Sequence, residues 1–144
     1  MNNMRKLGLD YGDSRIGVAI TDPLGITAQG LETIHHNGND KVALKRLEEI
    51  FNEYDIDTIV IGMPINMDGS KTDRVEVTNK FIHKLKCKFS KIPIEQVDER
   101  LTTVAAHKTM NYLNINKNEK RNIVDTISAV YILETYMNKL KNEN

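Results

Sequence analysis

A short run of β-branched residues, Thr58-Ile59-Val60-Ile61, constrains the fold more than any other segment of this chain. After Thr58 the run has no polar residue, so it lacks the alternation of a strand with one face in water. A continuous apolar run of this length is typical of a strand that is buried on both faces, as in a parallel sheet. Gly62-Met63-Pro64 ends the strand. The run therefore predicts an α/β fold in which helices cover both faces of a sheet.

The segments that precede this strand predict three antiparallel strands and a helix. Leu7–Leu9 and Ile16–Ile20 are strand-like, and the turn-forming residues between them indicate a hairpin. Thr27–Ile34 follows a second turn and is expected to add a third strand. From Asp40 the apolar residues recur at helical spacing, which predicts a helix with Asn39 or Asp40 as its N-cap.

The segments that follow predict a further alternation of helices and strands. We expect a helix over about Thr72–Cys87, a strand over Ile92–Val97, a short helix from Thr102 or Thr103 to Met110, and a long helix from about Glu119 to Leu140. Residues 141–144 are expected to fray. This order predicts a mixed sheet, in which a three-strand antiparallel meander is followed by βαβ units. Without a linker or an internal repeat, residues 1–144 are expected to form a single domain.

Charge and cysteine content exclude some classes of protein. The chain has 20 lysine and arginine residues against 20 acids, so its formal net charge is zero and it is not a uniformly basic nucleic-acid coat. A local basic patch is still allowed. Cys87 is the only cysteine, which excludes an internal disulfide and a CxxC zinc site. With no signal-like or membrane-length apolar run, we expect a soluble cytoplasmic protein that does not enter a membrane.

Three acids stand where their predicted elements could bring them together. Asp10 ends the first strand, Glu99 follows the strand that ends at Val97, and Asp125 lies inside the last helix. Ligands in open α/β sheets bind beyond the carboxyl ends of strands. If the two strands are neighbours and the last helix packs across them, the three carboxylates converge.

Helix geometry makes Asp125 the sharpest single observation. At about 100° per residue, Asp125 lies roughly 60° from the centre of the apolar side of its helix. That side is formed by Ala129, Ile132, Leu133, Tyr136, Met137 and Leu140. Burial of a lone ionised carboxylate is costly unless the group is paired or binds a metal. The small residues Ser128 and Ala129 follow one turn later, so this face of the helix could approach the sheet closely.

Each acid also has an ordinary explanation. Asp10 could form a turn or a cap, Glu99 could be a solvated acid at a strand end, and Asp125 could pair with Arg121 or with another cation at the edge of the core. As a set, without a cysteine or histidine cluster, the three carboxylates suit a hard cation such as Mg²⁺ or Mn²⁺. Two such ions can stabilise the attacking and leaving oxygens in phosphodiester cleavage.

Four segments resemble the YqgF family, also called RuvX, whose bacterial members are described as pre-16S rRNA nucleases or Holliday junction resolvases. They are LGLDYGDSRIGVAITDPLG from Leu7, IVIGMPINMDGS from Ile59, VDERLTT from Val97 and VDTISAVYILETYM from Val124. Together they span nearly the whole chain in the family's order. Family members commonly carry Ala-Ala where this chain has Ser128-Ala129, a change that keeps the small volume.

The resemblance implies an RNase H-like fold with a metal-dependent nuclease site. The family's first-strand aspartate corresponds to Asp10, the acid of its DER-type motif to Glu99, and its last-helix aspartate to Asp125. These three residues are the expected catalytic residues and metal ligands, with Mg²⁺ or Mn²⁺, and two ions, as the expected cofactor. Asp98 belongs to the same motif and is expected to support the site without binding the metal.

Several cations and a threonine are candidates for holding substrate phosphates. Arg15 and Arg100 are each fixed close to a proposed metal ligand, and Lys120 and Arg121 precede Asp125 by about one helical turn. Thr102 could offer a helix N-terminus to a phosphate, although capping explains it equally well.

Three functions compete at this point. The first is a metal-dependent nuclease that acts on the 5′ end of pre-16S rRNA or, as the alternative, resolves branched DNA. The second is ATP binding, because Asp10-Tyr11-Gly12-Asp13-Ser14 after a strand resembles the first phosphate loop of the actin and sugar-kinase ATPases. The third is a catalytically silent module that docks on ribosomal precursor particles. The sequence does not distinguish a monomer from a homodimer.

Overall fold

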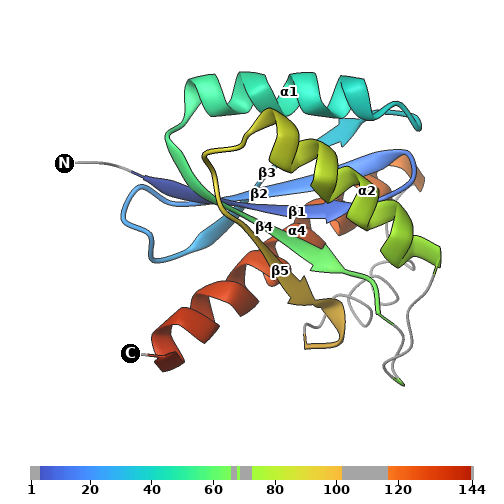
Figure 1. Cartoon of the computed structure of the whole chain (residues 1–144). Helices are drawn as coiled ribbons and strands as arrows, with labels where there is room; N and C mark the ends of the chain where they lie inside the picture. The colour runs from blue at the N-terminus through green and yellow to red at the C-terminus, as the bar shows by residue number, and fades with distance from the viewer. Residues whose placement is uncertain (1–3, 66–67, 69–72, 102–116, 144) are drawn as a thin grey trace.

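The computed structural model describes residues 4–65, 68, 73–101 and 117–143 (Figure 1). For residues 117–123 the description is limited to the helical backbone. The predicted short helix that starts at Thr102 or Thr103 lies outside the described residues.

Within the described residues, five strands form one mixed sheet in the order β3-β2-β1-β4-β5. The strands β1, β2 and β3 form an antiparallel meander, while β4 is parallel to both β1 and β5. Their bounds are Arg5–Tyr11 for β1, Arg15–Thr21 for β2, Ala28–His35 for β3, Ile56–Met63 for β4 and Ile94–Asp98 for β5. The predicted fold class is confirmed, but β1 and β5 are not neighbours, because β4 lies between them.

The helices cover both faces of the sheet, as Figure 1 shows. On one face lie α1 (Asp40–Glu53), which Asn39 caps by accepting a hydrogen bond from the Lys41 N–H, and α2 (Asp73–Lys88). The other face is covered by the long helix α4 (Lys117–Glu143). Helix α4 continues through Glu143, so it includes residues 141–143, whose fraying stays a prediction.

Strand alternation divides the interior into two cores. Leu7, Leu9 and Tyr11 of β1 pack toward α1 and α2 in the larger core. Gly8 and Asp10 alternate with them and face α4. The core on that side is smaller and includes Ala19, Val60, Ala129, Ile132 and Leu133. The two sides of the sheet are therefore built differently, with large side chains under α1 and α2 and small ones under α4.

Glycines on four adjacent strands let α4 lie close to the sheet. They are Gly30, Gly17, Gly8 and Gly62, on β3, β2, β1 and β4 respectively. A Cβ at Gly8 would lie 2.9 Å from the Ala129 carbonyl oxygen, and a Cβ at Gly17 would collide with the carbonyl oxygen of Asp125. Ser128 and Ala129 are fully buried, which agrees with the close approach expected from their size.

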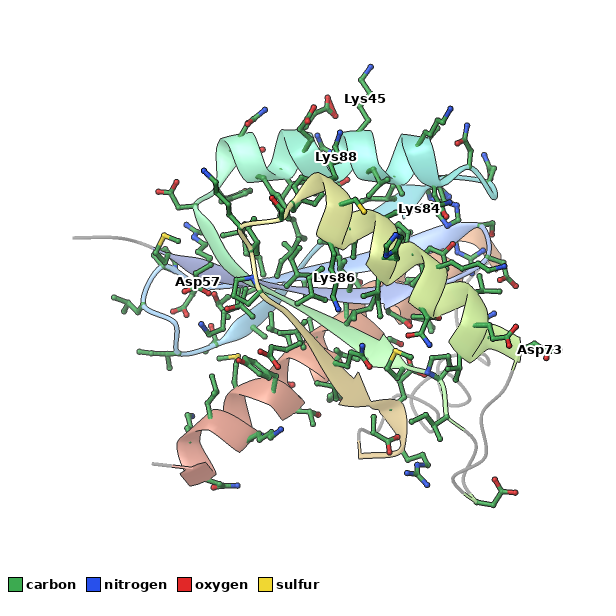
Figure 2. The ribbon with its side chains drawn as sticks, in the orientation of Figure 1. Lys45, Asp57, Asp73, Lys84, Lys86 and Lys88 are labelled. Atoms are coloured by element: carbon green, nitrogen blue, oxygen red, sulfur yellow. The ribbon has the colours of Figure 1, made fainter. Side chains whose placement is uncertain are left out.

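Ion pairs link α1 to α2 on the outer surface, and at least one partner of each pair is exposed. Lys84 contacts Asp40 at 2.9 Å, and Lys88 contacts Glu48 at 3.3 Å. Figure 2 shows Lys45 on the same layer, pointing away from the sheet. Such surface pairs contribute little to stability, typically below about 1 kcal/mol each. Among the described helices, none is long and apolar enough to cross a bilayer.

Substitution of the sheet glycines should test the close approach of α4. We expect Gly17→Ala to lower the free energy of unfolding by about 2 kcal/mol or more, because its Cβ meets helix backbone that cannot rotate away. Gly30→Ala is the matched control, since its Cβ would meet only the Thr126 side chain, at 3.2 Å. Thermal denaturation of both variants measures the difference. Equal melting of Gly17→Ala and the wild type would show that α4 does not lie this close.

Candidate functional site

The three predicted acids line one cavity of about 360 Å³ at the carboxyl end of β1. Asp10, Glu99 and Asp125 come from a strand, a turn and a helix that are far apart in the sequence. The remaining lining residues are Tyr11, Gly12, Asp13, Ser14 and Arg15 around the β1–β2 turn, together with Pro64 and Arg74. The cavity is therefore polar, with acids and arginines on its walls.

Asp10 and Asp125 share the cavity because of the glycine between their backbones. Asp10 pairs with Gly17 in the antiparallel register of β1 and β2, so both positions face α4. The backbone of Asp125 lies directly over Gly17. Asp10 is a buried residue, with a relative exposure of 7%. A larger residue at position 17 would lift the helix, and with it Asp125, away from Asp10.

Glu99 enters the cavity by a route that the sequence did not predict. It begins the 3-10 turn η1 (Glu99–Leu101) after β5, one strand further from β1 than expected. Its side chain lies over Gly62 of β4, where a Cβ would be 2.8 Å from Glu99 Oε1 and 3.1 Å from its Cγ. The absence of a side chain at Gly62 thus leaves the space that Glu99 occupies. The only sequence signal was a glycine at the end of a buried strand.

Asp125 is paired with Arg15. Arg15 Nε donates a hydrogen bond of 2.7 Å to Asp125 Oδ2, and the two side chains are 27% and 14% exposed. The partner suggested by the sequence was Arg121, whose side chain lies outside the described residues. The Asp125 carboxylate, on the apolar face of α4, is therefore paired with a cation from β2. This pairing offsets the unfavourable free energy of its partial burial.

The DER-type segment folds back on itself next to Glu99. Arg100 contacts Asp98 at 2.6 Å and also donates its backbone N–H to Asp98 Oδ1. These hydrogen bonds hold the pKa of the Asp98 carboxyl below its usual range and raise the pKa of Arg100. Neither residue lines the cavity. A role for Arg100 in binding phosphate remains a prediction, and Thr102 and the side chains of Lys120 and Arg121 lie outside the described residues.

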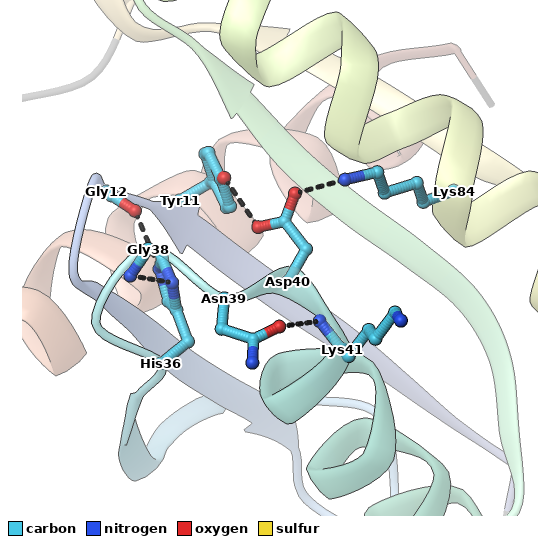
Figure 3. A network of polar contacts seen from close by, with 8 residues as sticks. All are labelled: Tyr11, Gly12, His36, Gly38, Asn39, Asp40, Lys41 and Lys84. Carbon is cyan, nitrogen blue, oxygen red and sulfur yellow. Dashed lines mark hydrogen bonds and ion pairs between the residues drawn. The ribbon is translucent and has the colours of Figure 1, made fainter.

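The β1–β2 turn is held from the opposite side of the sheet, as Figure 3 shows. His36 is 2% exposed; its Nε2 donates to the Gly12 carbonyl at 2.9 Å, and its Nδ1 accepts from the Gly38 N–H at 3.1 Å. Both bonds require the neutral ring with its hydrogen on Nε2. The His36 N–H also donates to the Ser14 carbonyl. Its polar surroundings predicted a loop, and nothing in the sequence singled out His36 as a residue that holds this turn.

Tyr11 connects this turn to the helical layer. Its ring stacks on Phe81 with centroids 4.3 Å apart and on His36 at 5.6 Å. Its hydroxyl donates to Asp40 Oδ1 at 2.8 Å, and Asp40 Oδ2 accepts from Lys84 Nζ. Burial, reinforced by the contact with Asp40, raises the pKa of the Tyr11 hydroxyl well above its usual value. The residue next to Asp10 is thereby fixed from the other face of the sheet.

The donor set fits a divalent cation in its chemistry. Asp10, Glu99 and Asp125 present only carboxylate oxygens, which hard cations such as Mg²⁺ prefer. Within the part of the chain that the structure describes, no three His, Cys, Asp or Glu side chains lie close enough together to hold one ion. One oxygen of Asp125 is bound by Arg15 in this arrangement.

Comparison with known proteins identifies the family. The RuvX family model, described as Holliday junction resolvase, matches residues 4–139. The chain belongs to the RuvX family. A RuvX relative from Ruminiclostridium cellulolyticum, named "Putative pre-16S rRNA nuclease", is 56% identical over 137 residues, which cover 95% of this chain and 96% of the relative. A relative of the same name from Acetivibrio thermocellus is 52% identical, with 93% and 95% covered.

Solved structures confirm the RuvX fold as RNase H-like, similar to that of RuvC. RuvC of Thermus thermophilus, solved in complex with a Holliday junction substrate, has a TM-score of 0.59 at 12% identity, covering 95% of this chain and 96% of RuvC. The Holliday junction resolvase of fowlpox virus has a TM-score of 0.55 at 16% identity, covering 95% and 99%. At these identities the likeness concerns the fold alone.

The contact between Arg100 and Asp98 predicts a measurable change in acid titration. In Arg100→Gln the pKa of Asp98 should rise toward the usual value of about 4, because the donor that stabilises the carboxylate is lost. Since the native pKa is depressed, the stabilisation from Asp98 is present above that usual value and is lost as the pH falls through the native pKa. Carbon NMR of the aspartate carboxyls during acid titration measures the shift.

Asp22 is the internal control for this titration. Its pKa is lowered by backbone N–H groups, chiefly that of Thr27, and not by an arginine. It should titrate identically in the wild type and in Arg100→Gln. An unchanged pKa of Asp98 in the variant would refute the cause assigned here.

Proposed function

We propose that this protein is a metal-dependent nuclease that hydrolyses phosphodiester bonds. The observation that carries the proposal is the presence of Asp10, Glu99 and Asp125, from three separate elements, on the wall of one cavity. Membership of the RuvX family supports the same activity and favours it over the ATP-binding alternative. The three acids that the family resemblance implied are all among the residues that line this cavity.

The favoured substrate is the 5′ end of pre-16S rRNA. Relatives that are 56% and 52% identical over nearly their whole length carry the name of a pre-16S rRNA nuclease. The second candidate is branched DNA, which the description of the family model supports. In either case the partner is nucleic acid, and for rRNA the protein would work on ribosomal precursor particles in the cytoplasm. A resolvase that cuts two strands symmetrically would act as a dimer, whereas the nuclease could act as a monomer.

The proposed cofactor is Mg²⁺ or Mn²⁺, with two ions held by Asp10, Glu99 and Asp125. When bound, such ions polarise the phosphate and supply a hydroxide nucleophile near neutral pH. The position of the Asp10 carboxylate is set by the hydrogen-bonded register of β1. The distance of the Asp125 backbone from the sheet is set by the packing of α4 on Gly17. Such fixed groups need little rearrangement when charge develops on the phosphate.

The arginines of the cavity would orient the substrate. Arg15 and Arg74 both line it, and guanidinium groups bind phosphate oxygens in pairs. Arg74 reaches the β1–β2 turn from the first turn of α2, donating to Asp13 Oδ2 at 3.2 Å and to the Tyr11 carbonyl at 3.3 Å. It is 47% exposed, so it can exchange these partners for a phosphate.

One cleavage experiment tests the activity and chooses between the substrates. A labelled 5′-extended rRNA leader and a four-way DNA junction are incubated with Mn²⁺ or Mg²⁺ and with the wild type, Asp10→Asn, Glu99→Gln or Asp125→Asn. We expect the wild type to cut the leader and each variant to lose at least about 100-fold in rate, because one ligand of the cation is weakened. Melting temperatures measured in parallel confirm that the variants fold.

The other possible results of this cleavage experiment each point to a different function. Symmetric cutting of the junction alone, lost in the variants, would establish the resolvase instead. If neither substrate is cut, or if Asp10→Asn cuts as well as the wild type, the nuclease proposal fails and the silent binding module takes its place. Full activity in a single variant would remove that residue from the site.

Gly62→Ala tests the route by which Glu99 reaches the cavity. The added Cβ would lie 2.8 Å from Glu99 Oε1 and 2.6 Å from Ile132 Cδ1, both ends of side chains that can move. We therefore expect a cost in stability of only about 1 kcal/mol, but a fall in cleavage rate of about tenfold or more, because Glu99 is displaced. Gly30→Ala, also under α4, is the control that should keep full activity. Wild-type cleavage by Gly62→Ala would contradict the role of this glycine.

A further inference from the structure

Among the described residues that line the cavity, Arg15 and Asp125 form an ion pair that joins a cation to a proposed metal ligand. Arg15 Nε donates to Asp125 Oδ2 at 2.7 Å, and the second contact of the guanidinium is a longer one of 3.4 Å to Ser14 Oγ. Both residues line the cavity with Asp10 and Glu99. The charge of Asp125 is therefore compensated by a cation that the protein itself supplies.

A divalent cation at Asp125 and the guanidinium of Arg15 in its present place oppose each other. They would share one carboxylate, and like charges at such short range repel strongly outside bulk water. Asp10, Glu99 and Asp125 line one cavity, yet in the described part of the chain no three such side chains lie close enough to hold an ion. The ion pair with Arg15 explains how Asp125 can line the same cavity as Asp10 and Glu99 without lying close enough to them to share an ion.

Of the two partners, Arg15 is the one free to move. The backbone of Asp125 rests against Gly17, and its side chain is only 14% exposed. Arg15 is the first residue of β2, with a side chain that is 27% exposed beside the β1–β2 turn. A rotation of this long side chain keeps the strand pairing intact and leaves its guanidinium in the same cavity.

We propose that Arg15 is an exchangeable counter-ion, which holds Asp125 in the metal-free site and yields it to a divalent cation. The released guanidinium then faces the cavity, where its planar donors suit a phosphate oxygen of the bound nucleic acid. Arg15 thereby acts as a positioning residue for Asp125 before the cation binds and as a substrate contact afterwards. The inference rests on the proposed metal-dependent function and specifies how its site is assembled.

Calorimetric titration with Mn²⁺, without nucleic acid, tests the exchange. We expect Arg15→Gln to bind Mn²⁺ with a Kd about tenfold lower than the wild type, because the competing charge is gone. Arg15→Lys should fall between them, since an ammonium keeps the charge but loses the directed Nε–H bond. Melting temperatures show that each variant is folded before titration.

Arg74→Gln is the matched control for charge. Arg74 lines the same cavity, but its guanidinium binds Asp13 and the Tyr11 carbonyl rather than a proposed metal ligand. It should tighten Mn²⁺ binding by no more than about twofold. The proposal is overturned if Arg15→Gln binds Mn²⁺ no more tightly than the wild type, if Arg74→Gln tightens binding equally, or if none of the proteins binds Mn²⁺.

Nitrogen NMR of the Arg15 side chain gives a second readout that does not depend on turnover. The Nε–H signal should be protected from solvent exchange in the metal-free protein and lose that protection when Mg²⁺ is added. Retained protection at saturating Mg²⁺ would overturn the exchange. The Mn²⁺ and Mg²⁺ results also separate this inference from the proposed function. Tighter Mn²⁺ binding by Arg15→Gln, with no cleavage by the wild type, supports the exchange and defeats the nuclease.

Discussion

The close packing of α4 on the sheet is the contact on which the cavity depends. Gly30, Gly17, Gly8 and Gly62 remove the side chains that would separate helix from strands, and Ser128 and Ala129 do the same from the helix. Ile132 and Leu133 of α4 are fully buried in the same contact, so close backbone packing and apolar burial act together there. A helix lifted by one methyl group would carry Asp125 away from Asp10. The position of the acids is thus a consequence of the packing.

Successive side chains of β1 point to opposite faces of the sheet, so the residues that line the cavity and the residues that pack the core lie on different faces. Asp10 points toward α4 and the cavity, while its neighbours Leu9 and Tyr11 point into the large core beneath α1 and α2. His36 and Asp40 then fasten the β1–β2 turn from the core side, through Gly12 and Tyr11. The wall of the cavity is held by groups that do not enter it, which leaves the cavity side free for ligand chemistry.

The sequence predicted those parts of the structure that depend on local periodicity. The buried run at Thr58–Ile61, the helical spacing from Asp40 and the apolar side of the last helix each depend on residues close together in the chain, and each was confirmed. Asp125 could be placed on the buried side of α4 because helix geometry needs no knowledge of the rest of the fold. Asp10, Glu99 and Asp125, which the sequence singled out, all line the cavity, together with Asp13, which it did not single out.

The features that the sequence could not predict depend on the order of the strands in the sheet. Because β4 lies between β1 and β5, Glu99 has to cross a strand, and the residue that permits this, Gly62, acquires its meaning only from that order. Arg15, which binds Asp125, is 110 positions away in the chain, so the periodicity of α4 could not single it out as the partner. The periodicity of a segment predicts its own secondary structure and its buried side, but not which side chains from other elements will contact it.

The charges of the cavity show why a neutral protein can keep such a site. Carboxylates that converge without a cation repel one another and raise the cost of burial. In this chain Arg15 binds Asp125 directly, and Arg74 binds the neighbouring turn through Asp13. Both arginines are long and part-exposed, while Asp10 and Asp125 are held by strand and helix backbone. The acids are therefore fixed and their counter-ions movable. Because the acids are fixed and the arginines can move, the arginines can neutralise the acids until a cation binds and can then bind the phosphates of a nucleic acid.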